Sequence, residues 1–260
     1  MMKKAQMRLS TSTFFTATLL TAVALLFMSA SGCDSAADSQ AVPAAPVKVQ
    51  IDTRFGPMVV QLSDSTPQHR DNFVKLVEEG FYDSLLFHRV IKEFMVQGGD
   101  PQSKGASENA RLGNGGPGYT IEAEIRPDHL HIKGALAAAR QGDNINPEKR
   151  SSGSQFYLVQ GRPFSEVEMS GIEGRIANFA NEYGNGLENV ENGQFVYSAE
   201  SREAYQRLGG TPFLDMQYTV FGYVVEGLSI IDSIATVETD RRRGDRPVED
   251  VVVKSMKRLN

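Results

Sequence analysis

The sequence predicts an all-β domain, either a barrel or a sandwich, with two helices and an added helical segment. Short apolar stretches bounded by Gly, Asp, Asn or Pro recur along residues 47–256, which is typical of many short strands joined by turns. Outside one segment, only two stretches have the apolar spacing of a helix. That segment, residues 161–211, breaks the rhythm because its apolar residues lie three and four positions apart.

The composition is that of a globular protein and excludes several classes. The chain has 260 residues, 27 basic and 32 acidic, with a formal net charge of −5, and its 24 Gly and 11 Pro follow no collagen-like period. Without clustered Lys and Arg, the charge balance argues against a nucleic-acid-binding protein. The single Cys excludes an internal disulfide and a Cys-based zinc site.

The first 32 residues have the pattern of an export signal. Lys3, Lys4 and Arg8 give this segment a positive start without acidic residues, and an apolar run over 14–28 follows. This run is shorter than the ~20 apolar residues of a spanning helix, although an uncleaved membrane anchor is the alternative. We expect residues 1–32 to be a signal peptide.

Cys33 directly follows small residues, which resembles a bacterial lipoprotein processing site where the Cys is lipidated. Ala30 stands where that motif usually carries Leu. The alternative is ordinary cleavage near Ala30, which would leave a soluble exported protein with a free thiol. Residues 33–46 combine this Cys with a flexible tether rich in Ala, Ser, Asp and Pro. We therefore expect a membrane-anchored lipoprotein of the cell envelope that faces the periplasm or the outside.

The exported part, residues 47–260, begins with a predicted hairpin and a helix. Alternating apolar residues over 47–51 indicate a strand, and a Gly-Pro turn at 56–57 leads into a returning strand over 58–62. Thr66 and Pro67 suit a helix start, and Gly80 suits its end. Apolar residues at helical spacing between them define its inner face: Phe73, Leu76 and Val77.

Further strands and one more helix follow. A second helix is predicted from Gly227 to Thr236, and a last strand over Val248–Met256. The other strands are predicted at Leu85–Ile91, Phe94–Val96, Ala135–Ala139, Gln155–Val159 and Tyr218–Val225.

Residues 161–211 are predicted to be a helical insertion in the β domain. About fifty residues are too few for a large independent core. A second helix over Ser198–Leu208 would end at Gly209-Gly210, with a loop over 184–193 between the two helices. The first helix is indicated by the spacing of Met169, Ile172, Ile176 and Phe179.

Three local patterns are weak indications of function. Residues 113–118 match G-x-G-x-x-G, but Pro117 and the absence of a βαβ pattern favour a surface loop over a nucleotide site. His129 and His131 could share a strand face, but no third metal ligand is evident at usable spacing. Ser154 lies in no nucleophile elbow. We therefore expect no metal.

The most informative stretch is 87–100, which places an Arg, large apolar residues and a Gln just before a Gly-Gly turn. Strand alternation would set Phe87, Arg89 and Ile91 on one face. An Arg on an apolar face is unusual without a task. From spacing alone, a structural pairing of Arg89 with a carboxylate at the barrel rim is equally compatible.

The motifs together resemble the cyclophilin family of peptidyl-prolyl cis–trans isomerases. They are FHRVIKEFMVQGGDP at 87–101, GSQFY at 153–157, FLD at 213–215 and YTVFG at 218–222, with the glycine-rich loop and GALAAA at 134–139 in the family's order. The resemblance covers roughly 47–160 and 212–258. It implies a closed eight-stranded antiparallel barrel capped by two helices, no cofactor, and proline-containing polypeptides as substrates.

The resemblance also implies roles for individual residues. Arg89 matches the catalytic arginine, and His88 matches the His beside it, which we expect to line the substrate groove. Tyr157 stands where Phe is usual, which would put a hydroxyl at the proline pocket, and Phe213 and Tyr218 also depart from some members. The matches to groove-lining positions are Phe94, Met95, Gln97, Ala139, Gln155, Tyr157, Phe213, Leu214 and Tyr218.

The chemistry of X-Pro rotation explains these residue types. Rotation must break amide resonance, and an Arg proton directed at the prolyl nitrogen would stabilise the twisted state over the planar one. We expect an isomerase that assists the folding of exported proteins. The alternatives are a binding module that grips Pro-containing segments without turnover, and an anchored scaffold built on 161–211.

Overall fold

The computed structural model describes residues 45–183, 190–191 and 194–259. Side chains are described outside 177–195. The predicted signal peptide, Cys33 and nearly all of the tether lie outside the described residues. Within the described part, no helix is long and apolar enough to span a membrane.

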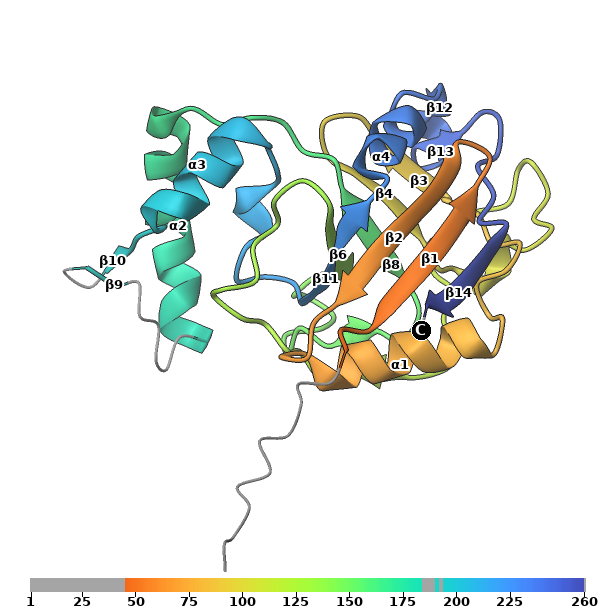
Figure 1. The fold of residues 1–260 in the computed structure, drawn as a ribbon, viewed down its shortest axis with the longest axis horizontal. Helices are drawn as coiled ribbons and strands as arrows, with labels where there is room; N and C mark the ends of the chain where they lie inside the picture. The colour runs from red at the N-terminus through yellow and green to blue at the C-terminus, as the bar shows by residue number, and fades with distance from the viewer. Residues whose placement is uncertain (1–44, 184–189, 192–193, 260) are drawn as a thin grey trace, which may run out of the picture. The chain divides into compact units, whose positions relative to one another are not determined.

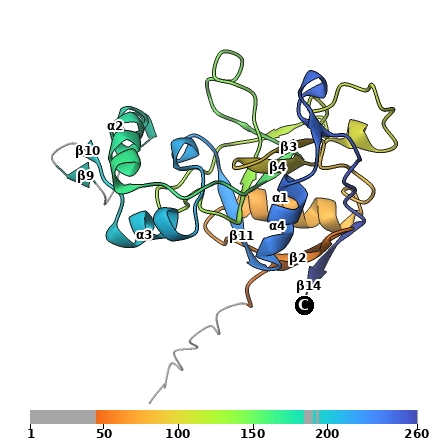
Figure 2. The same cartoon turned by 90° about the horizontal axis from the view of Figure 1, so that it is seen from above.

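An eight-stranded antiparallel sheet forms the body of the fold and curls around its own core (Figures 1 and 2). The strand order is β14-β1-β2-β11-β6-β8-β4-β3. The strands are β1 (Lys48–Thr53), β2 (Gly56–Leu62), β3 (Arg89–Ile91), β4 (Met95–Gly98), β6 (Ala135–Ala138), β8 (Phe156–Val159), β11 (Val220–Glu226) and β14 (Ser255–Leu259). The strands predicted at 47–51, 58–62, 94–96, 135–139, 155–159 and 218–225 are confirmed, whereas only Arg89–Ile91 of the one predicted at 85–91 is a strand.

The expected closure of this sheet into a barrel needs correction. In the described residues the edge strands β3 and β14 do not pair, so the ladder is open. The segments ahead of them meet instead, through an isolated bridge between Leu86 and Val252 and a 2.8 Å hydrogen bond from the Phe87 N–H to the Val251 carbonyl. The predicted last strand over 248–256 is therefore divided: residues 251–253 make this bridged contact, and β14 starts at Ser255.

Two helices cover the main core, as predicted. Helix α1 (Pro67–Glu78) buries Phe73, Leu76 and Val77, and helix α4 (Leu228–Ala235) buries Ile231 and Ile234. Both lie against the sheet in Figure 1. Their apolar side chains join those of the sheet in one buried cluster, which includes Val60, Val96, Leu136 and Leu158.

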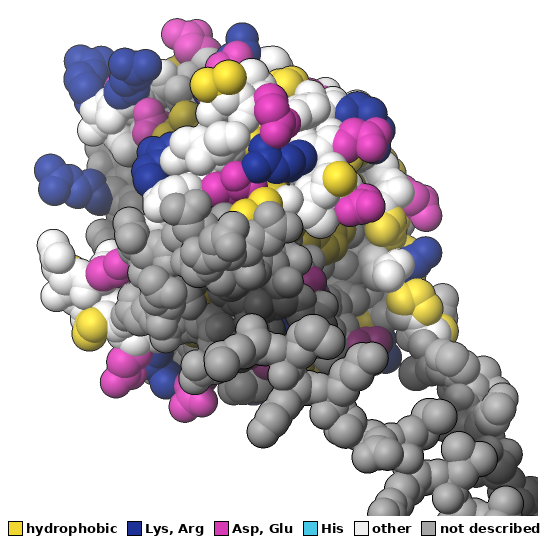
Figure 3. All heavy atoms as spheres, turned by 90° about the vertical axis from the view of Figure 1, so that its left-hand side faces the viewer, with side chains coloured by type: hydrophobic (Ala, Val, Ile, Leu, Met, Phe, Trp, Pro, Cys, Tyr) yellow, Lys and Arg dark blue, Asp and Glu magenta, His cyan; other side chains and the backbone are white. Residues whose placement is uncertain are grey.

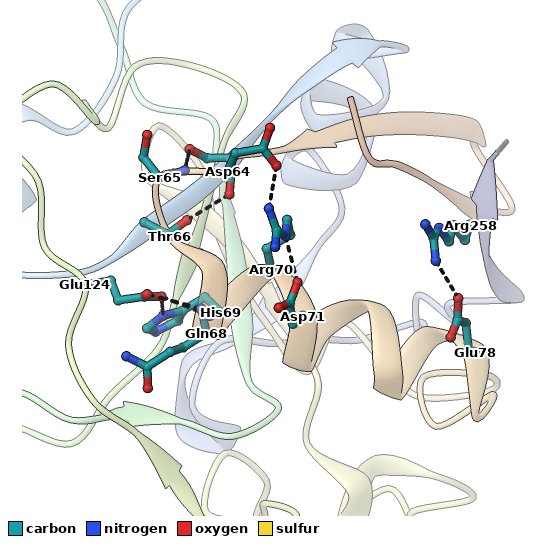
Figure 4. Close-up of polar contacts among 11 residues, drawn as sticks. Asp64, Ser65, Thr66, Gln68, His69, Arg70, Asp71, Glu78, Glu124 and Arg258 are labelled. Carbon is teal, nitrogen blue, oxygen red and sulfur yellow. Dashed lines mark hydrogen bonds and ion pairs between the residues drawn. The ribbon is translucent and has the colours of Figure 1, made fainter. Parts of the chain in front are cut away.

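Glu124 lies in a loop, and its side chain binds the start of helix α1 (Figure 4). Its carboxylate accepts hydrogen bonds from the backbone N–H groups of Gln68 and His69, and it lies 2.6 Å from His69 Nδ1. Burial disfavours the charged carboxylate, but the hydrogen bonds from His69 and Gln68 outweigh it and lower the Glu124 pKa.

The central strands are apolar on both faces because each face packs on a different cluster. Along β8, Phe156 and Leu158 enter the main core, whereas Tyr157 and Val159 enter a second cluster on the other face of the sheet. Strand β4 does the same with Val96 on one face and Met95 on the other. This second cluster, which contains Met95, Tyr157 and Val159 and is called the outer cluster below, forms the base of the candidate site.

Residues 161–211 contain the two predicted helices, α2 (Glu166–Tyr183) and α3 (Ala199–Arg207). The Ser198 hydroxyl caps α3 by accepting from the Ser201 N–H at 3.2 Å. The predicted loop over 184–193 is largely undescribed, but strand β9 (Val190–Glu191) within it pairs with β10 (Gln194–Phe195). The Phe179 side chain lies outside the described ones.

These helices have an apolar cluster of their own. It consists of Phe164, Met169, Ile172, Ile176, Tyr197, Tyr205 and Met216, with Ile125, Leu130 and Ile132 packed against it. On the face drawn in Figure 3, acidic and basic side chains are interspersed. Arg202 pairs with both Glu166 and Glu173. Because Ile125, Leu130 and Ile132 pack against this apolar cluster, the segment contacts the β domain at these three residues.

The remaining elements are short. They are the pair β5 (Thr120–Ile121) and β7 (Ser151–Ser152), the pair β12 (Thr239–Asp240) and β13 (Arg246–Pro247), and the 3-10 turns η1 (Pro101–Ser103), η2 (Pro212–Leu214) and η3 (Arg241–Arg243).

Candidate active site

Arg89 lies on the edge strand β3, beside the outer apolar cluster. It faces Gln97 of β4 in the strand register, and its Nη1 donates to Gln97 Oε1 at 3.4 Å. The Arg89 Nε atom lies 4.0 Å from Asp245 Oδ2, so the carboxylate pairing considered from sequence is present but long. The Arg89 side chain is still 41% exposed. An exposed ion pair of this kind contributes about 0–1 kcal/mol to stability. Because the pairing is weak, the guanidinium stays available to a ligand.

Two glutamines continue the polar edge of the site. Gln97 Nε2 donates to Gln155 Oε1 at 3.0 Å. Gln155 Nε2 in turn donates to the carbonyls of Gly113 and Gly115, at 3.0 and 2.7 Å. Each amide is thus oriented by its neighbour, and the glycine-rich loop supplies the last acceptors.

The apolar residues predicted to line the groove lie together in the outer cluster. Phe94 stacks on Phe213 with ring centroids 5.9 Å apart, and Tyr157 meets Tyr218 edge-on at 5.9 Å. The cluster includes Met95 and Tyr157 as buried members and Phe94, Ala139, Leu214 and Tyr218 as half-buried ones. Phe213 is 45% exposed, which suits a rim position.

Arg140 supports the Tyr218 ring from outside the predicted set. Its guanidinium carbon lies 4.6 Å from the ring centroid, and its Nε donates to the Gln217 carbonyl at 2.8 Å. Arg140 also borders a hollow of about 560 Å³ next to the glutamines. Other residues lining this hollow include Gly115, Thr120, Asn146, Arg150 and Ser152.

Two sequence-based expectations about neighbours of Arg89 need correction. The strand starts only at Arg89, so Phe87 turns into the main core with Val90 instead of sharing the Arg89 face. His88 is not brought into the groove: it is 3% exposed and lies beneath Gly113, whose substituted Cβ would be 3.7 Å from His88 Nε2. Burial lowers the pKa of His88 to about 4.

The Tyr157 hydroxyl also differs from expectation. It lies 2.9 Å from His131 Nε2, so it is used inside the protein. Burial raises the Tyr157 pKa well above its usual value, which keeps the phenol protonated. His131 and His129 do not pair as metal ligands, since the Nδ1 atoms lie 2.7 Å from Asp215 Oδ1 and 2.8 Å from the Val220 carbonyl, respectively.

Some residues of this arrangement carried no usable signal in the sequence. Asp215 contacts His131, which is 84 positions away, and Arg140 contacts Gln217, which is 77 positions away. The sequence predicts that the glycine-rich segment is a loop, but nothing in it indicates that the loop carbonyls accept hydrogen bonds from Gln155. Among the described residues, no group of three or more His, Cys, Asp or Glu could hold a metal ion.

Comparison with known proteins agrees with this fold. The family model for cyclophilin-type peptidyl-prolyl cis–trans isomerases matches residues 47–258. The "Putative peptidyl-prolyl cis-trans isomerase" of Staphylococcus epidermidis is 35% identical over 211 residues, which cover 81% of this chain and 90% of that protein. The protein of the same description in Staphylococcus haemolyticus is 33% identical over equal shares.

Two further matches differ in extent. The "Putative bifunctional phosphatase/peptidyl-prolyl cis-trans isomerase" of Streptococcus pyogenes is 36% identical over 216 residues, covering 80% of this chain but only 38% of that longer protein. The crystal structure of a cyclophilin-type isomerase from Cryptosporidium parvum has a TM-score of 0.56 and 21% identity, covering 83% of this chain and 99% of the other. That match shows a likeness of fold.

Fold and comparisons together define a peptidyl-prolyl cis–trans isomerase. Within that class, the chain belongs to the cyclophilin-type family.

Proposed function

We propose that this isomerase acts on X-Pro bonds of exported proteins and that Arg89 is its catalytic residue. The observation that carries the assignment is the Arg89 guanidinium, which is half-exposed and hydrogen-bonded to Gln97 beside the outer apolar cluster. Arg246, by contrast, is 2% exposed and is held in an ion pair with Asp250. Arg89 instead keeps donors free for a ligand.

The proposed mechanism is electrostatic. Rotation about the X-Pro bond has a barrier of about 18–20 kcal/mol because the planar amide loses its resonance. In the twisted state the prolyl nitrogen has a localised lone pair, and the Arg89 guanidinium stabilises this state by donating a hydrogen bond to that nitrogen. Arginine suits this role because it stays charged and presents fixed donors.

The pocket and the glutamines would position the substrate. A dry base of Met95, Tyr157 and Leu214 suits the prolyl ring and strengthens the nearby charge interaction. Phe94, Phe213, Ala139 and Tyr218 would close its sides, while Gln97 and Gln155 would bind backbone groups of the peptide. A further structure of the Cryptosporidium parvum isomerase was determined in the presence of the dipeptide Ala-Pro, which supports proline-containing substrates.

An isomerisation assay on the full chain tests this function. Exchange spectroscopy on the peptide Ala-Ala-Pro-Phe reports the cis–trans rate directly. We expect acceleration at catalytic protein concentrations. Binding of the peptide without acceleration would favour the alternative, a module that grips Pro-containing segments.

The export and anchoring of the chain are part of the proposal. The support is the position of Cys33 after a charged, apolar and small-residue sequence. Replacing Cys33 with Ala should move the protein from the membrane fraction to a soluble exported fraction. Unchanged fractionation of the Cys33→Ala variant would contradict lipidation.

We also propose that 161–211 is an insertion into the family fold. Its support is the separate apolar cluster of α2 and α3. Replacing the segment with a short Gly-containing turn should leave a folded but less stable β domain. A deletion variant recovered only as aggregate would show that the segment is integral to the core.

A further inference from the structure

Asp215 is the centre of a buried hydrogen-bond network next to the outer apolar cluster. The residue is 2% exposed. Its Oδ1 accepts from the backbone N–H of His131 at 2.8 Å and lies 2.7 Å from His131 Nδ1. Its Oδ2 accepts from the hydroxyls of Tyr197 and Tyr205, at 2.5 and 2.6 Å. Four donors therefore converge on one carboxylate.

These contacts give the network a direction. A carboxylate that accepts from His131 Nδ1 requires a proton on that nitrogen, and in the tautomer that carries its single proton there Nε2 is an acceptor. The Tyr157 hydroxyl, 2.9 Å away, then donates to Nε2. Burial raises the pKa values of Tyr157, Tyr197 and Tyr205 well above the usual range, so all three phenols remain donors.

The two ends of the network belong to different parts of the chain. Tyr197 and Tyr205 are members of the apolar cluster around α2 and α3. Tyr157 belongs to the outer cluster at the base of the pocket and stacks on the His131 ring with centroids 6.0 Å apart. Asp215 also directly follows Phe213 and Leu214, whose turn ends with a hydrogen bond from the Asp215 N–H to the Pro212 carbonyl.

We propose that His131 and Asp215 are positioning residues through which segment 161–211 sets the shape of the proline pocket. The hydroxyl contact turns the Tyr157 ring so that its polar atom points away from the prolyl ring, and Asp215 holds the turn that presents Leu214. Residues 161–211 thereby become a specificity determinant. This inference rests on the proposed function, because it concerns how the same pocket binds proline.

Loosening the network should weaken substrate binding more than turnover. Arg89 lies on β3 and its hydrogen bond is to Gln97, neither of which contacts Asp215 or His131 in a described hydrogen bond. Tyr205→Phe and Tyr197→Phe each remove one donor without removing the ring. We expect each to raise KM by roughly three- to tenfold, the scale of one hydrogen bond, with kcat within about twofold of the parent.

A matched control separates positioning from general destabilisation. Tyr82 is 1% exposed and donates its hydroxyl to the Ser154 carbonyl at 3.2 Å, outside the network. Tyr82→Phe should lose a comparable amount of stability in urea unfolding and leave KM unchanged. A KM increase equal to that of Tyr205→Phe would show that any lost buried hydroxyl has this effect, which overturns the proposal.

A double-variant cycle tests the link to Tyr157. His131→Leu in the parent leaves the Tyr157 hydroxyl buried without an acceptor, and we expect KM to rise about tenfold. The Tyr157→Phe variant has no hydroxyl that could lose its acceptor. In this background, adding His131→Leu should therefore change KM by less than about twofold relative to Tyr157→Phe alone. Equal effects in both backgrounds would refute the relay through Tyr157.

Titration calorimetry with Ala-Ala-Pro-Phe distinguishes this proposal from the proposed function. An inactive parent would refute the isomerase assignment, yet the same variants would still be compared by peptide Kd. Weaker peptide binding by Tyr205→Phe and Tyr197→Phe, with binding by Tyr82→Phe unchanged, supports the network. Unchanged Kd and KM in the folded network variants overturn it.

Discussion

Replacing His88 with Leu should remove a large part of the acid sensitivity of the fold. His88 is 3% exposed, and neither of its ring nitrogens has a hydrogen-bond partner of normal geometry. Desolvation lowers its pKa from 6.5 to about 4, so the folded chain holds the ring neutral while the unfolded chain protonates it. Stability is therefore fully present above about pH 6.5 and decreases as the pH falls from there toward the folded pKa.

The pKa difference sets the size of the effect. Since each pKa unit corresponds to about 1.36 kcal/mol, protonation linkage should cost the parent about 2 kcal/mol between pH 7 and pH 5. Urea unfolding at both pH values measures this loss. His88→Leu should lose about 2 kcal/mol less than the parent over the same interval.

Phe87→Leu is the matched control, because Phe87 is the adjacent, fully buried residue and does not titrate. It should lower stability by about 1 kcal/mol at both pH values and keep the parent's pH dependence. If parent and His88→Leu lose stability in parallel between pH 7 and pH 5, the argument from burial is wrong.

Three further predictions concern the fold and the groove. Glu124→Gln should cost about 1.5–3 kcal/mol at pH 7, measured by urea unfolding, and this difference should shrink as the pH falls through the lowered carboxyl pKa. Gly99 has φ +86°, and an added Cβ would lie 2.2 Å from the Ser154 carbonyl oxygen, so Gly99→Ala should cost about 3 kcal/mol or more. The control Gly105→Ala, with φ +63° and open space, should cost about 1 kcal/mol in the same assay. Phe213→Ala should raise KM by about three- to tenfold with little change in the unfolding midpoint, because the rim residue stacks on the groove but is 45% exposed; an unchanged KM would remove Phe213 from the groove.

The parts of the fold that sequence could predict depend on short-range periodicity. The spacing of Phe73, Leu76 and Val77 fixes one face of α1, and Ser198 marks the start of α3, since both signals lie within a few residues. The closure of the sheet is different. Apolar alternation over 248–256 is the same whether Val251 and Val253 join a ladder or a single bridge, so the start of β14 could not be located.

The site divides in a similar way. Motif resemblance predicted Arg89 and the groove residues, and the structure places six of the predicted residues in one apolar cluster: Phe94, Met95, Ala139, Tyr157, Leu214 and Tyr218. The position of His88 could not follow from alternation, because the chain is irregular just before β3. The environment of the Tyr157 hydroxyl depends on His131, which is 26 positions away, and on Asp215, a further contact across 84 positions. Tertiary packing brings such distant partners together, and these contacts produce no periodic pattern in the local sequence.

The catalytic efficiency of Arg89→Ala, compared with that of Arg258→Ala, tests the central claim most directly. Arg258, on β14, is a matched control because its side chain is 49% exposed and pairs with Glu78 of α1, whereas that of Arg89 is 41% exposed. We expect Arg89→Ala to lower kcat/KM for Ala-Ala-Pro-Phe isomerisation by roughly a hundredfold or more, the scale of one preorganised donor, with unchanged circular dichroism. Arg258→Ala should retain the parent's kcat/KM. A folded Arg89→Ala variant with near-parent kcat/KM would contradict the proposed mechanism.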